Sequence, residues 1–495
     1  MYPIPIETRL FNVGQVRELE QRAVQENSFN PLDLMETAGA RAFAVLKARS
    51  TTKRMRLGIV CGVGNNAGDG YVVARHASLS GWQVVIWELD GDKKLPPNAL
   101  EMRNQLPSNV LIIDELSSFH DCDWIVDALI GSGLSRTVTG SLATAIGEIN
   151  STTCKVMSLD LPSGLDGDTG RVRGVAVHAN LTICFVALKW GLVVGQGKEV
   201  SGEVVLERLG VPDSKYEQLS PVGVLISDHL RREALPPRRY DAHKGNFGHT
   251  LIIGGDIGFQ GAARLAGEAA ARVGSGLVSL GTRYANALAI SSQCPELMAF
   301  PLESNADFKR VTERCTVLAV GPGLGRSQWA DWIMNSVIII KMGAMILDAD
   351  ALNWLSENPM KLSNSIVTPH PGEAARLLEC STADVQANRV ETARQISDRY
   401  DAVCVLKGAC TVVTGPEELV WVCTAGNPGM AAGGMGDVLT GIIAGLAAQG
   451  LDMMKAATVG VWVHATSGDR AAAGGERGLL PSDLMLSLKD VVNAG

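Results

Sequence analysis

The sequence has few aromatic residues, no long apolar run and no run of basic residues, and these absences exclude several classes of protein. Phe, Trp and Tyr together make up only 5% of the 495 residues. No segment reaches the roughly 18 apolar residues that span a bilayer, so we expect no membrane partner. The net charge is −8, and lysine and arginine are not clustered, so we expect no nucleic-acid partner.

Two further signals are missing. The first ten residues, MYPIPIETRL, lack the basic and apolar stretches of a secretory signal. The ten cysteines form no Cys-x-x-Cys pair, and most lie in apolar runs, as Cys184 and Cys404 do. This spacing is more typical of reduced thiols than of disulfides or a zinc site. We therefore expect a cytoplasmic protein.

The composition that remains is that of a large α/β protein. Hydrophobic residues make up 46% of the chain and are mostly small and aliphatic. A chain of this length is expected to form two or three domains. The segments Val211 to Ser220 and Arg231 to Tyr240 are polar or rich in charge and proline, and we place the boundary near the first of them. The predicted domains are residues 1–215 and 224–495, and no sequence repeat relates them.

The N-terminal half alternates apolar strand-like runs with helix-like segments. Val13 to Arg49 has helical spacing broken near Asn30-Pro31, which predicts two helices. Strands are predicted at Arg56 to Cys61, Gln83 to Leu89, Val110 to Ile113, Trp124 to Leu129 and Val156 to Leu159. This alternation predicts a parallel, doubly wound, Rossmann-like sheet.

The loop after the first of these strands is a partial dinucleotide fingerprint. Gly62, Gly64 and Ala67 fit Gly-x-Gly-x-x-Ala, and Glu88 follows about 20 residues later, as the acidic residue that binds the ribose would. Asp69 departs from the pattern, because a carboxylate would repel pyrophosphate at this place. A hydride-transfer domain is therefore the alternative reading of this half.

Polar residues follow several of the predicted strands. In an open parallel sheet, the loops at the carboxyl ends of the strands share one crevice, so Asn66, Asp127, Asp160 and Ser163 should converge. Their oxygen atoms suit a weakly bound cation, although each aspartate could instead cap a helix or a turn. The loop Gly131 to Thr137 offers donors for phosphate, and Lys189 lies at the same edge, solvated or paired with a carboxylate.

The C-terminal half begins a second alternation of strands and helices. Its strands are predicted at Thr250 to Ile253, Gly276 to Leu280, Val317 to Val320, Ala344 to Leu347, Ser365 to Val367, Ala402 to Leu406 and Cys410 to Val413. The last two should form a hairpin whose turn presents Lys407, a point charge suited to phosphate oxygens. His370, in a Pro-His-Pro turn, could contact a ligand or have only a structural role.

The segment Ala431 to Gly450 carries the strongest chemical signal. Gly433, Gly434 and Gly436 lead into Asp437 and then into a helix of small residues. Free N–H groups at a helix start favour negative charge, and a carboxylate there needs a role at the reacting atom. The combination predicts phosphoryl transfer with Asp437 directed at a substrate hydroxyl. The alternative is a tight turn with an Asp N-cap.

Together these motifs resemble a known family over nearly the whole chain. GNNAGDGYVVARH, VDALIGSG and LDLPSG are similar to the NAD(P)H-hydrate epimerase domain. HKGNFGH, GPGLGR, TPHPGEAARLL, LKGACTVV and GNPGMAAGGMGDVLTG are similar to the ADP-dependent NAD(P)H-hydrate dehydratase domain, which has a ribokinase-like fold. In this order they resemble the bacterial bifunctional NAD(P)H-hydrate repair enzymes. Ala67 and Pro428 stand where the family usually has Gly and Ala.

The resemblance implies repair of hydrated NADH and NADPH by an isomerase and a lyase in one chain. The first domain would interconvert the R and S hydrates, and the second would dehydrate the S form with ADP, giving AMP, phosphate and NAD(P)H. It also implies potassium in the epimerase and ADP as co-substrate, and phosphoryl chemistry usually needs Mg²⁺. We expect small-molecule partners, the hydrates and ADP, and a homo-oligomer.

The resemblance also assigns residues by motif position. We expect Asp437 and Asp160 to be catalytic. Potassium ligands would be Asn66, Asp127 and Ser163. Contacts to the hydrated dinucleotide in the first domain would be Asn65, Asn66, Ala67, Gly68, Asp69, Gly131, Ser132, Gly133, Leu134, Ser135, Arg136, Thr137 and Asp160. In the second they would be Ala262, Gly323, His370 and Asp437, with the adenine nucleotide held by Lys407, Gly408, Ala409, Cys410, Thr411 and Gly436.

Two other functions remain open at this point. A ribokinase-type kinase acting on a vitamin-precursor alcohol would have the same Gly-x-Gly-Asp segment, but would use ATP and leave a stable phosphorylated product. Alternatively, the N-terminal domain could be a non-catalytic binding module. A binding module would have no need for an ion site made of Asn66, Asp127 and Ser163.

Overall fold

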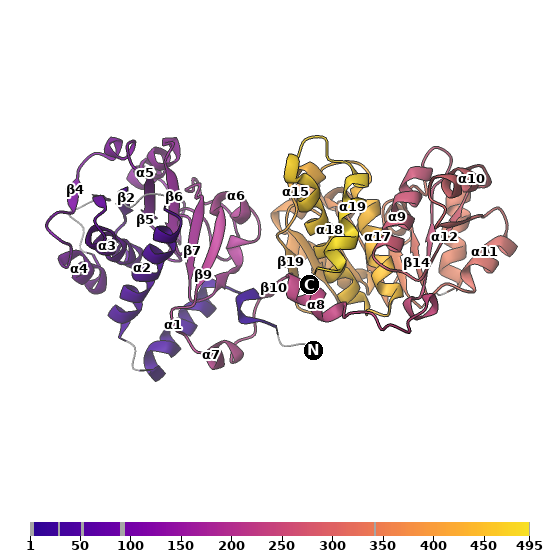
Figure 1. Ribbon diagram of the computed structural model, residues 1–495, viewed down its shortest axis with the longest axis horizontal. Coiled ribbons are helices and arrows are strands. Elements are labelled where there is room, and N and C mark those ends of the chain that lie inside the picture. Colours follow the sequence, from indigo (N-terminus) through magenta and orange to yellow (C-terminus); the bar gives the residue numbers. More distant parts are fainter. Residues whose placement is uncertain (1–3, 28–29, 51–53, 90–94, 341–342, 495) are drawn as a thin grey trace. The chain divides into compact units, whose positions relative to one another are not determined.

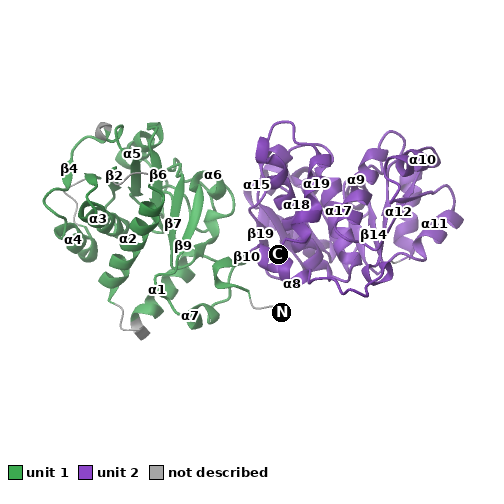
Figure 2. Cartoon of the chain, in the orientation of Figure 1, with its two compact units in different colours: residues 1–224 green, residues 225–495 purple. Residues whose placement is uncertain are grey.

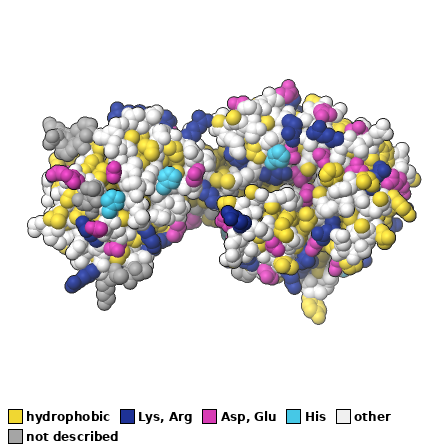
Figure 3. All heavy atoms as spheres, turned by 90° about the horizontal axis from the view of Figure 1, so that it is seen from above, with side chains coloured by type: hydrophobic (Ala, Val, Ile, Leu, Met, Phe, Trp, Pro, Cys, Tyr) yellow, Lys and Arg dark blue, Asp and Glu magenta, His cyan; other side chains and the backbone are white. Residues whose placement is uncertain are grey.

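A computed structural model describes residues 4–27, 30–50, 54–89, 95–340 and 343–494. The chain forms two compact units, residues 1–224 and residues 225–495 (Figure 2). Within the described part of the chain, no helix is both long and apolar enough to cross a membrane. On the face drawn in Figure 3, basic and acidic side chains are interspersed rather than gathered into one basic surface.

Unit 1 is built on a parallel sheet with the strand order β4-β3-β2-β5-β6-β7-β9. Its strands are β2 (Arg56–Cys61), β3 (Gln83–Glu88), β4 (Leu111–Ile113), β5 (Trp124–Ala128), β6 (Lys155–Leu159), β7 (Leu181–Phe185) and β9 (Glu203–Glu207). Its helices are α1 (Val13–Asn27), α2 (Pro31–Ala48), α3 (Asn65–Leu79), α4 (Pro97–Asn104), α5 (Gly140–Ser151), α6 (Gly197–Ser201) and α7 (Asp213–Glu217). From the central pair β2 and β5, the chain adds β3 and β4 on one side and β6, β7 and β9 on the other, which is the doubly wound pattern.

Alternation along the strands gives this sheet two apolar faces. Leu57 and Ile59 pack in one buried cluster with residues of α2 and α3. Val60 packs in another cluster with Ala145 and Ile146 of α5. Successive side chains of a strand point to opposite faces, so continuous apolar strands can be covered by helices on both sides. The predicted Rossmann-like sheet is confirmed.

Three short strands, β1 (Arg9–Phe11), β8 (Leu188–Lys189) and β10 (Gly223–Leu225), are hydrogen-bonded to one another outside the parallel sheet. β1 runs parallel to β8 and antiparallel to β10. Phe11 lies opposite Lys189 in this register. The apolar segment from Leu181 to Leu188 is thus divided between β7 and β8, and Lys189 is the last residue of β8.

Unit 2 has a mixed sheet with the order β13-β12-β11-β14-β15-β16-β17-β18-β19. The neighbours up to β17 pair in parallel, and the pairs β17–β18 and β18–β19 are antiparallel. Its strands are β11 (His249–Ile253), β12 (Leu277–Thr282), β13 (Met298–Pro301), β14 (Val317–Val320), β15 (Met345–Leu347), β16 (Ser365–Val367), β17 (Val403–Leu406), β18 (Thr411–Thr414) and β19 (Trp421–Cys423). The predicted hairpin is present as β17 and β18.

The helices of unit 2 flank this sheet (Figure 1). They are α8 (Asp228–Ala234), α9 (Gln260–Arg272), α10 (Tyr284–Gln293), α11 (Asn305–Thr312), α12 (Gln328–Ile340), α13 (Asp350–Glu357), α14 (Pro371–Leu378), α15 (Thr382–Ala387), α16 (Arg389–Tyr400), α17 (Met435–Ala448), α18 (Met453–Ala471) and α19 (Pro481–Val492). Gly441 and Gly445 of α17 let the backbone of α9 approach closely, because a Cβ at either place would clash with Ala266 or Ala270. This packing places the start of α17 at the carboxyl edge of the sheet.

Candidate functional sites in the two units

The carboxyl edge of the unit 1 sheet holds a fully buried carboxylate. Asp127 lies at the end of β5, and its Oδ1 accepts a hydrogen bond of 2.5 Å from the Ser163 hydroxyl. Its Oδ2 accepts bonds from the Ser163 amide at 2.9 Å and the Ser158 hydroxyl at 2.8 Å. These residues are far apart in sequence, so the shared edge of the parallel strands brings them together.

Asp127 has only neutral hydrogen-bond donors around it. Burial raises the pKa of its carboxyl, and the bonds from Ser163 and Ser158 oppose that shift. The side-chain amide of Asn66, at the same edge, has a buried Nδ2 atom with no hydrogen-bond partner in the described part of the chain. The oxygens of the Asp127 carboxylate, the Ser163 hydroxyl and the Asn66 amide are of the type that suits a weakly held cation. The three predicted potassium ligands therefore fit that ion.

Asp160 follows β6 and forms an ion pair with Lys189. Lys189 Nζ lies 2.5 Å from Asp160 Oδ1 and also donates to the Phe185 carbonyl at 2.6 Å. Lys189 is only 1% exposed, so of the two readings left open, solvated or paired with a carboxylate, the structure has the second. The Asp160 carboxylate raises the pKa of Lys189 against the opposing effect of burial. Asp160 itself has φ 67°, a left-handed conformation that non-glycine residues seldom adopt.

A cavity of about 350 Å³ lies beside this pair. Glu20 of α1, together with Asn65 and Asp69 of α3, contributes to its lining. Burial raises the pKa of Asp69 well above its usual range, and the carboxylates of Asp160 and Glu20 add to that shift. The pKa of Glu20 is raised by burial as well. Glu20 was not predicted from the sequence, because nothing in the pattern of α1 distinguishes it from a surface glutamate.

The remaining predicted contacts of unit 1 divide into two groups. The Ser132 amide donates to Asp160 Oδ2 at 3.1 Å, so the loop from Gly131 meets the carboxylate, whereas Arg136 and Thr137 at its far end are exposed. Ala67 is fully buried in α3. A Cβ at Gly68 would clash with Met35, so this glycine allows α2 and α3 to pack closely.

Glu88 does not have the position that a ribose-binding residue requires. Arg103 donates to both of its carboxylate oxygens, at 2.6 and 2.9 Å, and the Tyr71 hydroxyl donates at 2.7 Å. The Arg103 guanidinium holds the pKa of Glu88 below its usual range despite burial. Because this carboxylate is already committed within unit 1, the hydride-transfer alternative loses its acidic residue.

In unit 2, Asp437 lies in the first turn of α17. The N-cap is Gly434, with φ 94°, and its conformation explains a glycine at this position. The alternative reading of Asp437 as an N-cap is therefore wrong. Burial and the neighbouring Asp348 carboxylate raise the pKa of Asp437 to about 7, while Lys407 opposes the shift.

Asp348, at the end of β15, is the buried centre of this site. It is 1% exposed, and Lys407 Nζ donates to its Oδ1 at 2.7 Å. The Thr368 hydroxyl donates to the same oxygen at 2.8 Å, and the Thr440 hydroxyl donates to Oδ2 at 2.7 Å. A Cβ placed on Gly436 would lie 3.4 Å from Lys407 Nζ. The predicted nucleotide-binding residues Lys407 and Gly436 are thus neighbours.

The turn from Lys407 to Thr411 is supported from beneath by Arg389. Arg389 Nη2 donates to the carbonyls of Leu406, Lys407 and Cys410 at 3.0, 3.0 and 3.2 Å. Burial lowers the pKa of this guanidinium. Its partners in the turn are main-chain carbonyls, and Nη1 also donates to Gln386 Oε1 at 2.9 Å. Main-chain partners leave no pattern in the sequence, so no sequence signal identified Arg389.

His370 and Glu373 form a reciprocal cap at the start of α14. The His370 Nδ1 atom accepts from the Gly372 amide at 3.0 Å, and Glu373 Oε2 accepts from the His370 amide at 2.8 Å. The side chain of His370 remains 53% exposed. Burial raises the pKa of Glu373 to about 7, and burial with nearby Lys407 lowers that of His370. His370 thus has a structural role, with its Nε2 atom 3.4 Å from Glu373 Oε1, and its contact with a ligand stays a prediction.

Ala262 and Gly323 also meet. A Cβ at Gly323 would lie 3.1 Å from the Ala262 Cβ and 2.6 Å from the Phe259 carbonyl. Gly323 has φ 59°, so both space and backbone conformation require glycine there. These two predicted substrate contacts therefore lie next to each other.

The fold and the two clusters define an α/β protein of two units, each with its own polar cluster at the carboxyl edge of a sheet. Family models match both halves: NAD(P)H-hydrate dehydratase over residues 250–489, and YjeF-related protein N-terminus over residues 31–191. A solved ribokinase-like superfamily protein of Enterococcus faecalis is 29% identical, with a TM-score of 0.51 over 54% of this chain and 94% of its own. The predicted ribokinase-like fold of the second unit is confirmed.

Full-length relatives identify the family. The bifunctional NAD(P)H-hydrate repair enzyme Nnr of Coxiella burnetii is 43% identical over 98% of this chain and 100% of its own. The enzyme of the same name from Escherichia coli is 38% identical over 99% of this chain and 95% of its own. The chain belongs to the family of bifunctional NAD(P)H-hydrate repair enzymes. The family predicted from the sequence motifs is confirmed.

Proposed function

We propose that this chain repairs hydrated NADH and NADPH in two steps. Residues 1–215 interconvert the R and S hydrates, and residues 224–495 dehydrate the S form with ADP. The observation that carries this proposal is that each unit has its own polar cluster, around Asp160 in one and Asp437 in the other. A homo-oligomeric assembly remains our expectation.

For the dehydratase, Asp437 is the group that takes the proton. A ring hydroxyl leaves poorly as water, so converting it to a phosphate ester makes the departure easier. Asp437 removes the hydroxyl proton as that oxygen attacks the β-phosphorus of ADP, and AMP leaves. The C–O bond to phosphate then breaks as the nicotinamide ring loses a proton, which restores the double bond. A base with a pKa near the working pH suits this role, and the pKa of Asp437 is raised to about 7.

The nucleotide is held by the turn from Lys407 to Thr411 and by the start of α17. Lys407 supplies a cation, and the amides from Gly433 to Gly436 lie where helix N–H groups lack partners within the helix. The carboxylates of Asp348 and Glu373 already pair with Lys407, so the Mg²⁺ expected with ADP would be held mainly by the phosphate oxygens of the nucleotide. When bound, the cation would neutralise charge on the phosphates. Ala262, Gly323 and His370 then contact the hydrated dinucleotide.

For the epimerase, Asp160 is the group beside the hydrated carbon. Lys189 and the Ser132 amide both bond to its carboxylate and orient it. The hydrated dinucleotide lies against Asn65 to Asp69 and Gly131 to Thr137. In this role Asp160 assists proton or hydroxyl movement at the ring.

Potassium belongs beside Asn66, Asp127 and Ser163. The cation would compensate the negative charge of Asp127, which only neutral donors now face. When bound there, it would help to hold the loops that carry Asp160 and Ser163 in place. This fit also argues against the binding-module alternative for unit 1.

Product stoichiometry tests the proposal against the kinase alternative. With an S hydrate and ADP, one AMP and one phosphate should appear for each dihydronicotinamide restored. A kinase would consume ATP and leave a stable phosphorylated product without that absorbance. Accumulation of such a product would contradict the proposal.

A further inference from the structure

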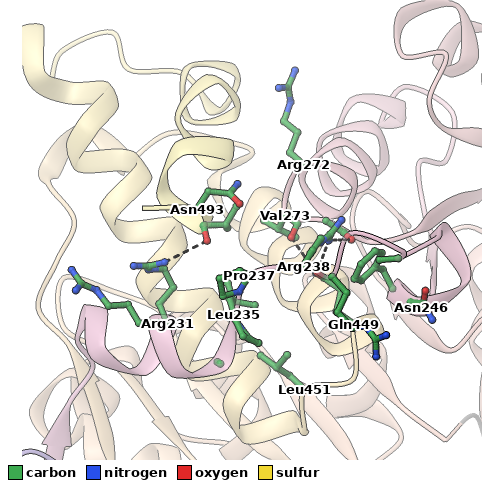
Figure 4. A pocket seen from close by; sticks show the side chains of 18 of the residues that line it. Arg231, Leu235, Pro237, Arg238, Asn246, Arg272, Val273, Gln449, Leu451 and Asn493 are labelled. Atoms are coloured by element: carbon green, nitrogen blue, oxygen red, sulfur yellow. Dashed lines mark hydrogen bonds between the residues drawn. The ribbon is translucent and has the colours of Figure 1, made fainter. Parts of the chain in front are cut away.

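Unit 2 has a second hollow, at the opposite end of its sheet from Asp437. It is a pocket of about 1100 Å³ lined by parts of residues 231–247, 271–274, 449–451 and 492–494 (Figure 4). These segments lie around the C-terminal ends of α9, α17 and α19 and before β11. Because α17 has 14 residues between these ends, the pocket is about 20 Å from the catalytic aspartate. No step proposed above uses it.

The lining of this pocket is strongly basic. Five arginines contribute to it, namely Arg231, Arg232, Arg238, Arg239 and Arg272, and Asp241 is its single acidic member. Asp228 and Glu268, outside the lining, pair with three of these guanidinium groups. Asp241 pairs with Arg239. Positive charge therefore exceeds negative charge at the pocket, in a protein whose net charge is −8.

Part of this charge has a structural explanation. Arg238 Nη2 donates to the Gly274 carbonyl at 2.6 Å and to Gln449 Oε1 at 2.8 Å, beyond the ends of α9 and α17. Its guanidinium also lies 3.6 Å from the centre of the Phe247 ring. Helix C-termini present carbonyls without partners, and a cation there is stabilising. These contacts give Arg238 a structural role.

Arg231 is not satisfied in the same way. It is 3% exposed, its Nε donates to Asp228 at 2.7 Å, and Nη1 lies 3.5 Å from the Val492 carbonyl. Its Nη2 is buried and has no hydrogen-bond partner among the described residues. In Figure 4 the guanidinium points towards the chain at Asn493, across the wall of the pocket. A buried donor without a partner is unfavourable, so a ligand that accepts from it would be stabilised.

The size and the other walls of the pocket restrict what that ligand can be. The volume slightly exceeds the range of about 300–1,000 Å³ usual for sites of drug-sized ligands, far more than a simple anion fills. Leu235, Pro237, Phe247 and Leu451 add apolar surface to the basic lining. The complementary ligand has phosphate groups at one end and a planar, weakly polar body at the other. Guanidinium groups bind phosphate well because their N–H groups match its geometry.

We propose that this pocket is a second, non-catalytic binding site for a phosphorylated nucleoside of mononucleotide to dinucleotide size. The phosphates lie against Arg231 and Arg272. The base lies against Leu451, Pro236 and Pro237. The site differs from both catalytic clusters in position and in residues. Occupation would join the ends of α9, α17 and α19 to the segment before β11.

Hydrogen exchange read by mass spectrometry locates the binding separately from the catalytic sites. The full chain is exposed to NADPH or to inorganic tripolyphosphate over a range up to millimolar. Peptides covering residues 228–247 and 489–494 should become protected with NADPH, and tripolyphosphate should protect them more weakly. Absence of protection in these peptides at saturating NADPH would overturn the proposal, whatever happens near Asp437.

Three variants define the chemistry of the site. Arg231→Lys retains the charge beside Asp228 but lacks the second donor arm, so half-saturation by NADPH should need at least tenfold more ligand. Arg399→Lys alters an exposed arginine paired with Glu379 and should change nothing. Leu451→Ala should weaken NADPH protection and leave that of tripolyphosphate unchanged. Equal protection by the two ligands, or wild-type behaviour of both pocket variants, would contradict a nucleoside site.

Discussion

Lys407 Nζ donates a hydrogen bond of 2.7 Å to Asp348 Oδ1, across 59 residues of sequence. The same carboxylate also accepts from two threonine hydroxyls, so it is committed to holding the lysine. Asp437 is different, because its carboxylate has no hydrogen bond to another described residue. Of these two neighbouring acids, Asp348 positions the Lys407 ammonium group, and Asp437 is available to take a proton.

Replacing Asp437 by Asn should abolish dehydration and leave ADP binding nearly unchanged. Loss of a general base typically lowers the rate by about 10²–10⁴-fold. Turnover is followed by dihydronicotinamide absorbance, and ADP affinity by calorimetry. Asp331→Asn, at an exposed position on α12, is the matched control. Retained turnover in Asp437→Asn would remove this residue from the mechanism.

The same substitution should not destabilise the protein at alkaline pH. The folded-state pKa of Asp437, about 7, is above its unfolded value of about 3.9, so the folded state binds the proton more tightly. Stability of the wild type therefore falls as pH rises between those values. The difference in melting temperature, Asn variant minus wild type, should grow from pH 4 to pH 8. A difference that shrinks would mean that the aspartate is charge-compensated.

The pH profile of the dehydratase should show an acid limb from the same group. Asp437 acts ionised, so kcat/KM should rise with pH and level off above about 7. Asp348→Asn removes a charge that raises the pKa of Asp437, so any residual activity should have its limb at lower pH. If the rise of kcat/KM with pH occurs at the same pH in that variant, the titrating group is not Asp437.

Lys189→Met should separate the two activities. The substitution removes the cation that pairs with Asp160, and epimerisation should fall by at least tenfold. Dehydration of a pure S hydrate should be unchanged, because Lys189 belongs to the other unit. Lys198→Met, at an exposed lysine of α6, serves as the control. Equal loss of both activities would indicate general unfolding instead.

Arg389→Lys should weaken nucleotide binding without touching the nucleotide. Lysine cannot reproduce three bonds from one guanidinium arm, and each bond to a buried carbonyl contributes about 1 kcal/mol. The KM for ADP should rise about tenfold while kcat changes little. A fall in kcat at unchanged KM would mean that the turn acts in chemistry rather than in binding.

Much of the fold could be predicted because the central strands are continuous apolar runs. Arg56 to Cys61 and Ser365 to Val367 were predicted with the bounds that the structure has. β9 and β13 were missed, and both lie at sheet edges where their residues are only partly buried. An edge strand is covered on fewer sides, so its sequence carries a weaker apolar pattern.

The candidate sites could also be predicted only in part. The approach of Ser163 to Asp127 could be predicted, because the ends of parallel strands share one edge. Lys189 pairing with Asp160, and Arg389 under the Lys407 turn, depend on where later segments return to the sheet. The sequence shows such residues only as ordinary basic side chains, and tertiary structure decides whether they are buried.

The most direct test of the whole account uses separated R and S hydrates of NADH with the wild-type protein. With ADP, both epimers should be converted fully to NADH, the R form after passing through the S form. Without ADP, each epimer should equilibrate with the other and no NADH should appear. Recovery of NADH from R without ADP, or failure to recover it with ADP, would contradict the account.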